Sequence, residues 1–139
     1  MSQESTTPDL VELVRALFDA VSRRDFDAAI SVYAPDAILR LTAMGTSVEG
    51  LAAIRGFLED FVGTFSEYEV ELEEILDLGS GVTFGVFLQQ GRPVGSSGRL
   101  QMRAASVGLW TDGLLARHTL DPEIDQARAA AERLAESRE

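Results

Sequence analysis

The chain contains neither cysteine nor lysine, and all 12 of its basic residues are arginines. Without cysteine there is no thiolate nucleophile, no disulfide framework and no cysteine ligand for a metal. Without lysine there is no side-chain amine for Schiff-base chemistry. His118 is the single histidine, and no second ligand accompanies it in the sequence, so we expect no metal site.

Long apolar runs are also missing. No stretch approaches the ~20 residues that span a bilayer. Residues 1–8 are polar and lack the basic and apolar regions of a signal peptide, so we expect them to form a flexible N-terminus. Since the absence of cysteine fits a reducing compartment, we expect a cytoplasmic protein that does not associate with membranes.

Positive charge is scarce, with 12 basic against 23 acidic residues and a formal net charge of −11. A polyanion partner requires clustered basic side chains, so we expect no binding to nucleic acid. Neither Gly45 nor the glycine- and serine-rich segment 91–98 belongs to a P-loop or a dinucleotide-binding fingerprint. We therefore expect no cofactor.

The length of 139 residues and the hydrophobic content of 45% are typical of one globular domain. Helix signals fill the first half of the chain. Residues 7–9 (Thr-Pro-Asp) read as a helix start, and apolar side chains recur at helical spacing over 10–21. A second, shorter helix is expected over 26–33, ending before a proline, and a third over 51–63.

Strand signals dominate the second half, where apolar and polar residues alternate. The alternation slips at Glu73 and Glu74, which indicates a β-bulge. A bulge would turn Glu74 toward solvent, whereas an unbroken strand would turn it toward the buried face. Residues 121–123 (Asp-Pro-Glu) repeat the helix-start signature, so we expect a domain over 9–125 followed by a C-terminal helix and tail over 126–139. The expected strands are 37–44, 67–78, 82–90, 100–110 and 114–120.

Several segments together resemble the SnoaL-like domains of the NTF2-like superfamily. They are the stretch 14–37 with its Arg-Asp-Phe-Asp and Tyr-Ala-Pro-Asp segments, Val-Glu-Gly at 48–50, Ala-Ile-Arg-Gly-Phe-Leu at 53–58, Trp-Thr-Asp-Gly at 110–113 and Leu-Asp-Pro at 120–122. The resemblance implies an α+β fold, a cone-shaped barrel in which helices pack in a strongly curved antiparallel sheet. It also implies a pocket between the helices and the concave face. Members include ketosteroid isomerases, polyketide cyclases, dehydratases, epoxide hydrolases and proteins that only bind.

The isomerase mechanism of that superfamily needs a carboxylate base and two acidic hydrogen-bond donors. The resemblance places the corresponding positions at Leu17, Leu41 and Ser106, none of which carries the required group. The sequence therefore argues against a ketosteroid isomerase of the usual kind.

His118 and Asp121 are the candidate catalytic residues. Strand alternation places His118 on the same face as Ser106, so the two side chains are expected to meet across neighbouring strands. His118 is then either a half-buried structural histidine or a base or donor within a pocket. Asp121 resembles an acid or base of some SnoaL-like cyclases, but Asp before Pro is also a ready helix cap. The two lie three apart on an extended segment and are not expected to form a dyad.

The pocket itself is expected to be mostly apolar, with Ser106 and His118 as its principal polar pair and Tyr33 near its mouth. The predicted ligand-binding residues are Tyr33, Phe61, Phe84, Ser106 and Trp110.

Two functions remain open from the sequence. One is a binding domain for a small apolar molecule. The other is a cofactor-independent isomerase, cyclase, dehydratase or hydrolase acting on a small polyketide- or steroid-like substrate by acid/base chemistry. We also expect a homodimer through the convex sheet face, because Ala105, Val107 and Leu109 would form an exposed apolar surface there beside Arg103.

Overall fold

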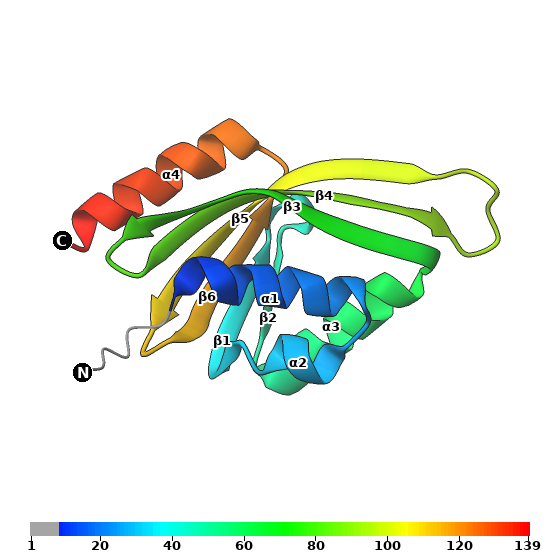
Figure 1. Ribbon diagram of the computed structural model, residues 1–139, viewed down its shortest axis with the longest axis horizontal. Coiled ribbons are helices and arrows are strands. Elements are labelled where there is room, and N and C mark those ends of the chain that lie inside the picture. The colour runs from blue at the N-terminus through cyan, green and yellow to red at the C-terminus, as the bar shows by residue number, and fades with distance from the viewer. Residues whose placement is uncertain (1–8) are drawn as a thin grey trace.

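The computed structural model describes residues 9–139, which form four α-helices, one 3-10 helix and a six-stranded sheet (Figure 1). The expectation of flexibility at residues 1–8 lies outside the described residues. No helix within 9–139 is both long enough and apolar enough to cross a membrane. In chain order the elements are α1 (Leu10–Ser22), α2 (Phe26–Ile30), β1 (Tyr33–Leu41), η1 (Thr42–Met44), β2 (Thr46–Glu49), α3 (Leu51–Gly63), β3 (Phe65–Gly79), β4 (Val82–Pro93), β5 (Leu100–Thr111), β6 (Leu114–Asp121) and α4 (Ile124–Ser137).

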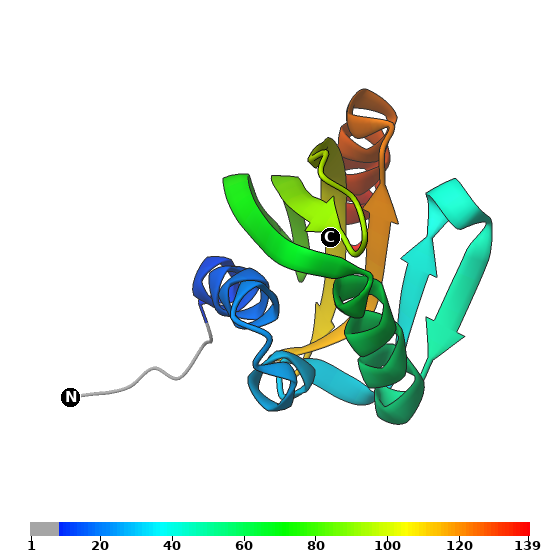
Figure 2. The same cartoon turned by 90° about the vertical axis from the view of Figure 1, so that its right-hand side faces the viewer.

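The strands form one curved sheet in the order β2-β1-β6-β5-β4-β3 (Figure 2). All neighbours pair antiparallel except β1 and β6, which are parallel. The sheet is therefore mixed, and the expectation of a purely antiparallel sheet is wrong at this one pair. Helices α1, α2 and α3 cover its concave face (Figure 1). The architecture is the predicted α+β cone, with a sheet that curves without closing into a barrel.

The start of α1 differs from the sequence prediction. Asp9 is the N-cap, and its carboxylate accepts a hydrogen bond from the Glu12 backbone N–H at 3.3 Å. The helix begins at Leu10, so the proline expected at its first position, Pro8, precedes it. Buried Val14, Leu17 and Val21 form the apolar stripe that packs on the sheet.

The segment 26–33 is not all helix. α2 ends at Ile30, and Tyr33 begins β1 instead of ending the helix. The apolar spacing that predicted helix through Tyr33 also fits a turn leading into a strand. The strand tolerates Pro35 because the pairing of β1 with β6 is irregular between Tyr33 and Ile38, so no ladder bond requires the missing N–H.

The long strands follow the predicted segments closely, and the register of β3 on β4 shifts between Leu72 and Glu74. The predicted bulge is therefore present. It turns Glu74 away from the concave face and toward α4, where Arg128 Nη2 lies 3.0 Å from Glu74 Oε1.

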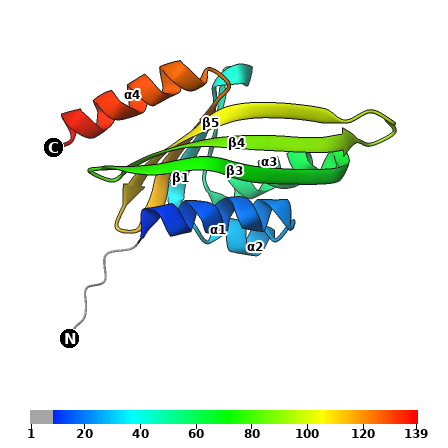
Figure 3. The same cartoon turned by 45° about the horizontal axis from the view of Figure 1, so that its top comes forward.

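Helix α4 folds back over the convex face (Figure 3). Ala127, Ala131 and Ala135 of α4 are buried against the outer face of β4 and β5 in a second hydrophobic core, and the Arg128 guanidinium lies 4.5 Å from the centre of the Phe84 ring. The remaining members of this core are Leu78, Val82, Val86, Ala105, Val107, Leu109, Ile124 and Leu134.

This helix corrects the expectation of an exposed apolar convex face. Ala105 is fully buried, because α4 already covers the apolar surface that was expected to bind a partner. Beyond α4 the same face is charged, with ion pairs from Glu67 to Arg99 at 2.7 Å and from Glu73 to Arg103 at 2.6 Å.

Candidate functional site

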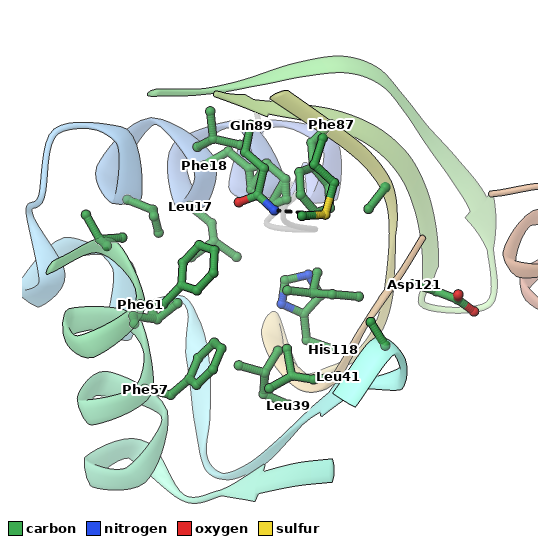
Figure 4. Close-up of a pocket in the computed structure, with 18 of the residues that line it drawn as sticks. Leu17, Phe18, Leu39, Leu41, Phe57, Phe61, Phe87, Gln89, His118 and Asp121 are labelled. Carbon is green, nitrogen blue, oxygen red and sulfur yellow. Dashed lines mark hydrogen bonds between the residues drawn. The ribbon is translucent and has the colours of Figure 1, made fainter. Parts of the chain in front are cut away.

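A cavity of about 300 Å³ lies between the concave face of the sheet and helices α1 and α3. Its wall is overwhelmingly apolar, and the side chains of Leu17, Phe18, Phe57 and Phe61 enter it from the helices (Figure 4). The polar or charged residues along its wall are Tyr33, Tyr68, Gln89, His118 and Asp121.

His118 sits in this wall between two hydroxyl groups. Its Nδ1 lies 2.7 Å from the Tyr33 hydroxyl and its Nε2 lies 2.7 Å from Ser106 Oγ. The side chains of Tyr33, Ser106 and His118 are all buried. In either neutral tautomer one ring nitrogen donates and the other accepts, so both hydrogen bonds of the imidazole are made. We call this chain of three side chains the hydroxyl–imidazole relay.

Burial without a nearby carboxylate controls the charge of the relay. Desolvation lowers the pKa of His118 from 6.5 to about 4, so the ring is neutral at physiological pH. Burial also raises the pKa of Tyr33, which keeps its hydroxyl protonated. The relay therefore carries hydrogen-bonding capacity without net charge, as an apolar cavity requires.

The sheet register brings the relay together. His118 lies opposite Leu39 of β1 and opposite Gly108 of β5. A Cβ at Gly108 would lie 2.6 Å from Thr83 Oγ1 and 2.8 Å from Trp110 Nε1, so only glycine fits there. The Trp110 indole N–H donates to Thr83 Oγ1 at 3.0 Å.

Asp121 borders the cavity but its carboxylate has a different partner. Asp121 Oδ1 accepts a hydrogen bond from the Glu123 backbone N–H at 2.9 Å, in the turn that precedes α4. Helix α4 begins at Ile124 with Glu123 as its N-cap, so Asp121 is not the cap and the helix starts slightly later than expected. In Figure 4 the carboxylate points away from His118, and the two residues form no dyad.

Two predicted cavity residues lie elsewhere. Phe84 belongs to the convex core under α4, so its expected place in the pocket wall is wrong. Trp110 packs in the concave core but lies beyond the cavity, where it bonds to Thr83. Tyr33 and Phe61 do line the cavity, while Ser106 reaches it only through His118.

Sequence reasoning missed Phe87 and Gln89, which supply the β4 wall of the cavity. Residues that pair directly across two strands share a face, and Gly85 pairs with Ser106. Residues 85, 87 and 89 therefore face inward, and Phe84 faces outward. The sequence offered no such signal, because the run from Val82 to Phe87 is buried on both faces.

No group of three or more His, Asp and Glu side chains in the described part of the chain is arranged to hold a metal ion. Among residues 9–139, the polar or charged side chains at the cavity wall are instead Tyr33 and His118 of the relay, Asp121, and a second pair formed by Tyr68 and Gln89.

A model of the SnoaL-like domain family matches residues 14–118. The chain belongs to this family. The resemblance expected from the sequence is thereby confirmed. A search among curated proteins found no match to the chain.

Solved structures show the same fold. A protein with a ketosteroid isomerase-like fold from Catenulispora acidiphila, in complex with trimethylamine, has a TM-score of 0.73 at 16% identity, covering 83% of this chain and 85% of that one. TerC co-crystallised with polyporic acid has a TM-score of 0.71 at 15% identity over 88% and 97% of the two chains. A protein proposed to be a polyketide cyclase, from Sinorhizobium meliloti, has a TM-score of 0.67 at 26% identity over 79% and 94%.

Proposed function

We propose that this SnoaL-like domain binds a small, largely apolar molecule that carries a carbonyl or hydroxyl group. The cavity of about 300 Å³ is the observation that carries the proposal, since its wall is apolar except for a few groups and the relay is buried in it. Binding sites for small molecules have this composition, with a few placed polar groups fixing the orientation of an apolar body.

The relay suits either kind of oxygen. When a ligand carbonyl accepts from the Tyr33 hydroxyl, His118 Nδ1–H donates to Tyr33 and the Ser106 hydroxyl donates to Nε2. When a ligand hydroxyl donates to Tyr33, all three bonds reverse and the other tautomer forms. Both ring nitrogens are bonded in both cases, so Tyr33, and not the imidazole, is the group that meets the ligand.

Similar proteins support a binding function. The structure from Catenulispora acidiphila contains trimethylamine, and TerC was co-crystallised with polyporic acid. Members of this fold thus hold small organic molecules, and the wall found here disfavours an anionic one, because none of the described side chains that line it is cationic at neutral pH.

The chain's single histidine makes the test direct. Binding of monoacetylnaphthalene, an uncharged ketone, should move the ring ¹⁵N signals of His118 toward the Nδ1–H tautomer. Ala104 lines the cavity and is buried, so Ala104→Phe should fill the space and weaken binding at least tenfold. Ala130→Phe, on the exposed side of α4, is the matched control. Equal affinity of both variants would contradict the proposal.

Acid/base catalysis is the second candidate. A neutral imidazole between two hydroxyls is a path for a proton, and the 26% identical protein from Sinorhizobium meliloti is proposed to be a polyketide cyclase. Against it, Asp121 is the one carboxylate along the cavity wall in the part of the chain that the structure describes, and it is bonded to the Glu123 backbone. Exchange of ketone α-hydrogens for deuterium, faster with the protein than with Ala104→Phe, would establish catalysis.

Two further expectations remain proposals. A cytoplasmic location is one. Homodimer formation is the other, and with α4 over Ala105 a partner on the convex face would have to pack on α4 or on the charged part of that face. Sedimentation of the full chain at micromolar concentration tests it, and a monomer would contradict it.

A further inference from the structure

A second polar group faces the same cavity from another strand. Gln89 of β4 and Tyr68 of β3 both line it, and the Tyr68 hydroxyl donates to Gln89 Oε1 at 2.9 Å. Among the described residues neither side chain is hydrogen-bonded to the relay, which belongs to β1, β5 and β6. Figure 4 shows the Gln89 amide and the His118 ring entering the open space from different walls.

The orientation of the Gln89 amide follows from its neighbours. Its Nε2 lies 3.9 Å from Met102 Sδ. A thioether sulfur has no hydrogen to donate, so the NH₂ end of the amide, and not the oxygen, must face it. The Tyr68 hydroxyl binds the oxygen end of the amide. The Tyr68 ring is held by the Phe61 ring, edge to face with the ring centres 6.0 Å apart, and by the Phe65 ring, whose centre lies 5.4 Å away.

Among the described residues, the amide nitrogen therefore has a weak hydrogen-bond partner at an apolar wall. Sulfur is a weak acceptor, and the contact in Figure 4 is the single hydrogen bond that Nε2 makes among the described residues. A ligand carbonyl that replaced sulfur would give a shorter and stronger bond. Burial raises the pKa of Tyr68, so its hydroxyl stays protonated and keeps the amide in this orientation.

The sheet register places the two polar groups at different positions along β5. Gln89 lies opposite Met102 on β5, whereas the His118 ring reaches Ser106, four positions further along that strand. Four residues of strand span about 13 Å. The relay and the Gln89 amide therefore lie at different positions along β5, as a ligand with an oxygen at each end requires.

We propose that Gln89 is a specificity-determining residue that binds a second oxygen, so that the preferred ligand is an elongated apolar molecule with an oxygen at each end. The proposal rests on the binding function proposed above. It adds that the end of the ligand remote from the relay carries a hydrogen-bond acceptor, which Gln89 Nε2 meets. Tyr68 is a positioning residue that acts through Gln89.

The test uses naphthalene carrying one acetyl group and naphthalene carrying acetyl groups at both ends. The full chain should bind the diacetyl compound about tenfold more tightly, the gain of one good hydrogen bond. Gln89→Leu should reduce this ratio to near one. Gln90→Leu is the matched control, because the neighbouring amide pairs with Gln101 on the opposite face and the ratio should persist.

Tyr68→Phe should lower the ratio through lost orientation of the amide, and should leave the histidine tautomer shift in place. A ratio that survives Gln89→Leu would overturn the inference while leaving the binding function intact. If neither compound binds the wild-type chain, both the inference and the proposed function are overturned.

Discussion

The Tyr33 hydroxyl lies 2.7 Å from His118 Nδ1, although 85 positions separate the two residues in the chain. Tyr33 begins β1 and His118 lies within β6, and these are the two strands that pair in parallel. Among residues 9–139 this is the one parallel pairing of strands, and it brings the hydroxyl to the ring. A helix ending at Tyr33 would not have placed it there.

Tyr33→Phe is expected to lower the free energy of unfolding by about 1–3 kcal/mol, because it leaves a buried ring nitrogen without a partner. Tyr68→Phe is the matched control. Its partner Gln89 is partly exposed and regains water, so the cost should stay below about 1 kcal/mol. Urea denaturation of both variants measures the difference. An equal loss of unfolding free energy in the two variants would show that the buried Tyr33–His118 hydrogen bond stabilises the fold no more than the partly exposed Tyr68–Gln89 bond does.

The stability of the fold should depend on the protonation of His118. The ring has a pKa of about 4 in the folded protein and 6.5 ordinarily. Between these values the unfolded chain takes up a proton that the folded protein does not. The stabilisation is therefore complete above pH 6.5 and is lost as pH falls toward 4. The loss between pH 6.5 and about pH 5 should be about 2 kcal/mol.

Denaturation of the wild type and of His118→Gln at a series of pH values isolates this contribution. The carboxylates titrate equally in both proteins and cancel in the comparison. The additional decrease in the free energy of unfolding as the pH falls should be absent in His118→Gln, whatever the absolute stability of that variant. Parallel curves for the two proteins would mean that His118 is not buried as a neutral ring.

Much of this arrangement could be predicted from local sequence patterns. Two local patterns predicted the structure correctly, namely the helical spacing over α1 and α3 and the slip in alternation at Glu73 and Glu74. Both depend only on how apolar residues recur within one short segment. The meeting of Ser106 with His118 also followed from alternation on two strands joined by a tight turn.

What failed depended on contacts between distant segments. The face of Phe84 is decided by register against β5, and the contact of Tyr33 with His118 by the pairing of β1 with β6. The return of α4 over the sheet has one signal in the sequence. Alanines at 127, 131 and 135 recur every four residues, and small residues on one helical face permit close packing on a sheet.

Gly108→Ala should destabilise the fold by about 1–3 kcal/mol. The added methyl group would meet Thr83 Oγ1 at 2.6 Å and Trp110 Nε1 at 2.8 Å, and so would break the hydrogen bond between them. Gly56→Ala in α3 meets no atom within 4 Å and should be neutral or stabilising by up to about 1 kcal/mol. Thermal denaturation followed by tryptophan fluorescence measures the stability of both variants, since Trp110 is the single tryptophan.

Ala131→Asp should detach α4 from the sheet. Ala131 is 1% exposed and packs in the convex core, so a carboxylate there would be buried without a partner. The loss of docking should cost more than about 2 kcal/mol and should expose the apolar outer face of β4 and β5. Ala130→Asp is the adjacent control, because that side chain is exposed and its substitution should change stability by less than about 0.5 kcal/mol.

Detachment of α4 should change the convex face of the sheet and leave the concave face intact, and different measurements report on each face. Ala131→Asp should bind a hydrophobic dye and sediment as larger species, because an uncovered apolar sheet face associates with its own copies. The His118 ring signals should persist, since the relay lies on the concave side, away from α4. If Ala131→Asp behaved as Ala130→Asp does in stability, dye binding and sedimentation, α4 would not be the element that keeps this face covered.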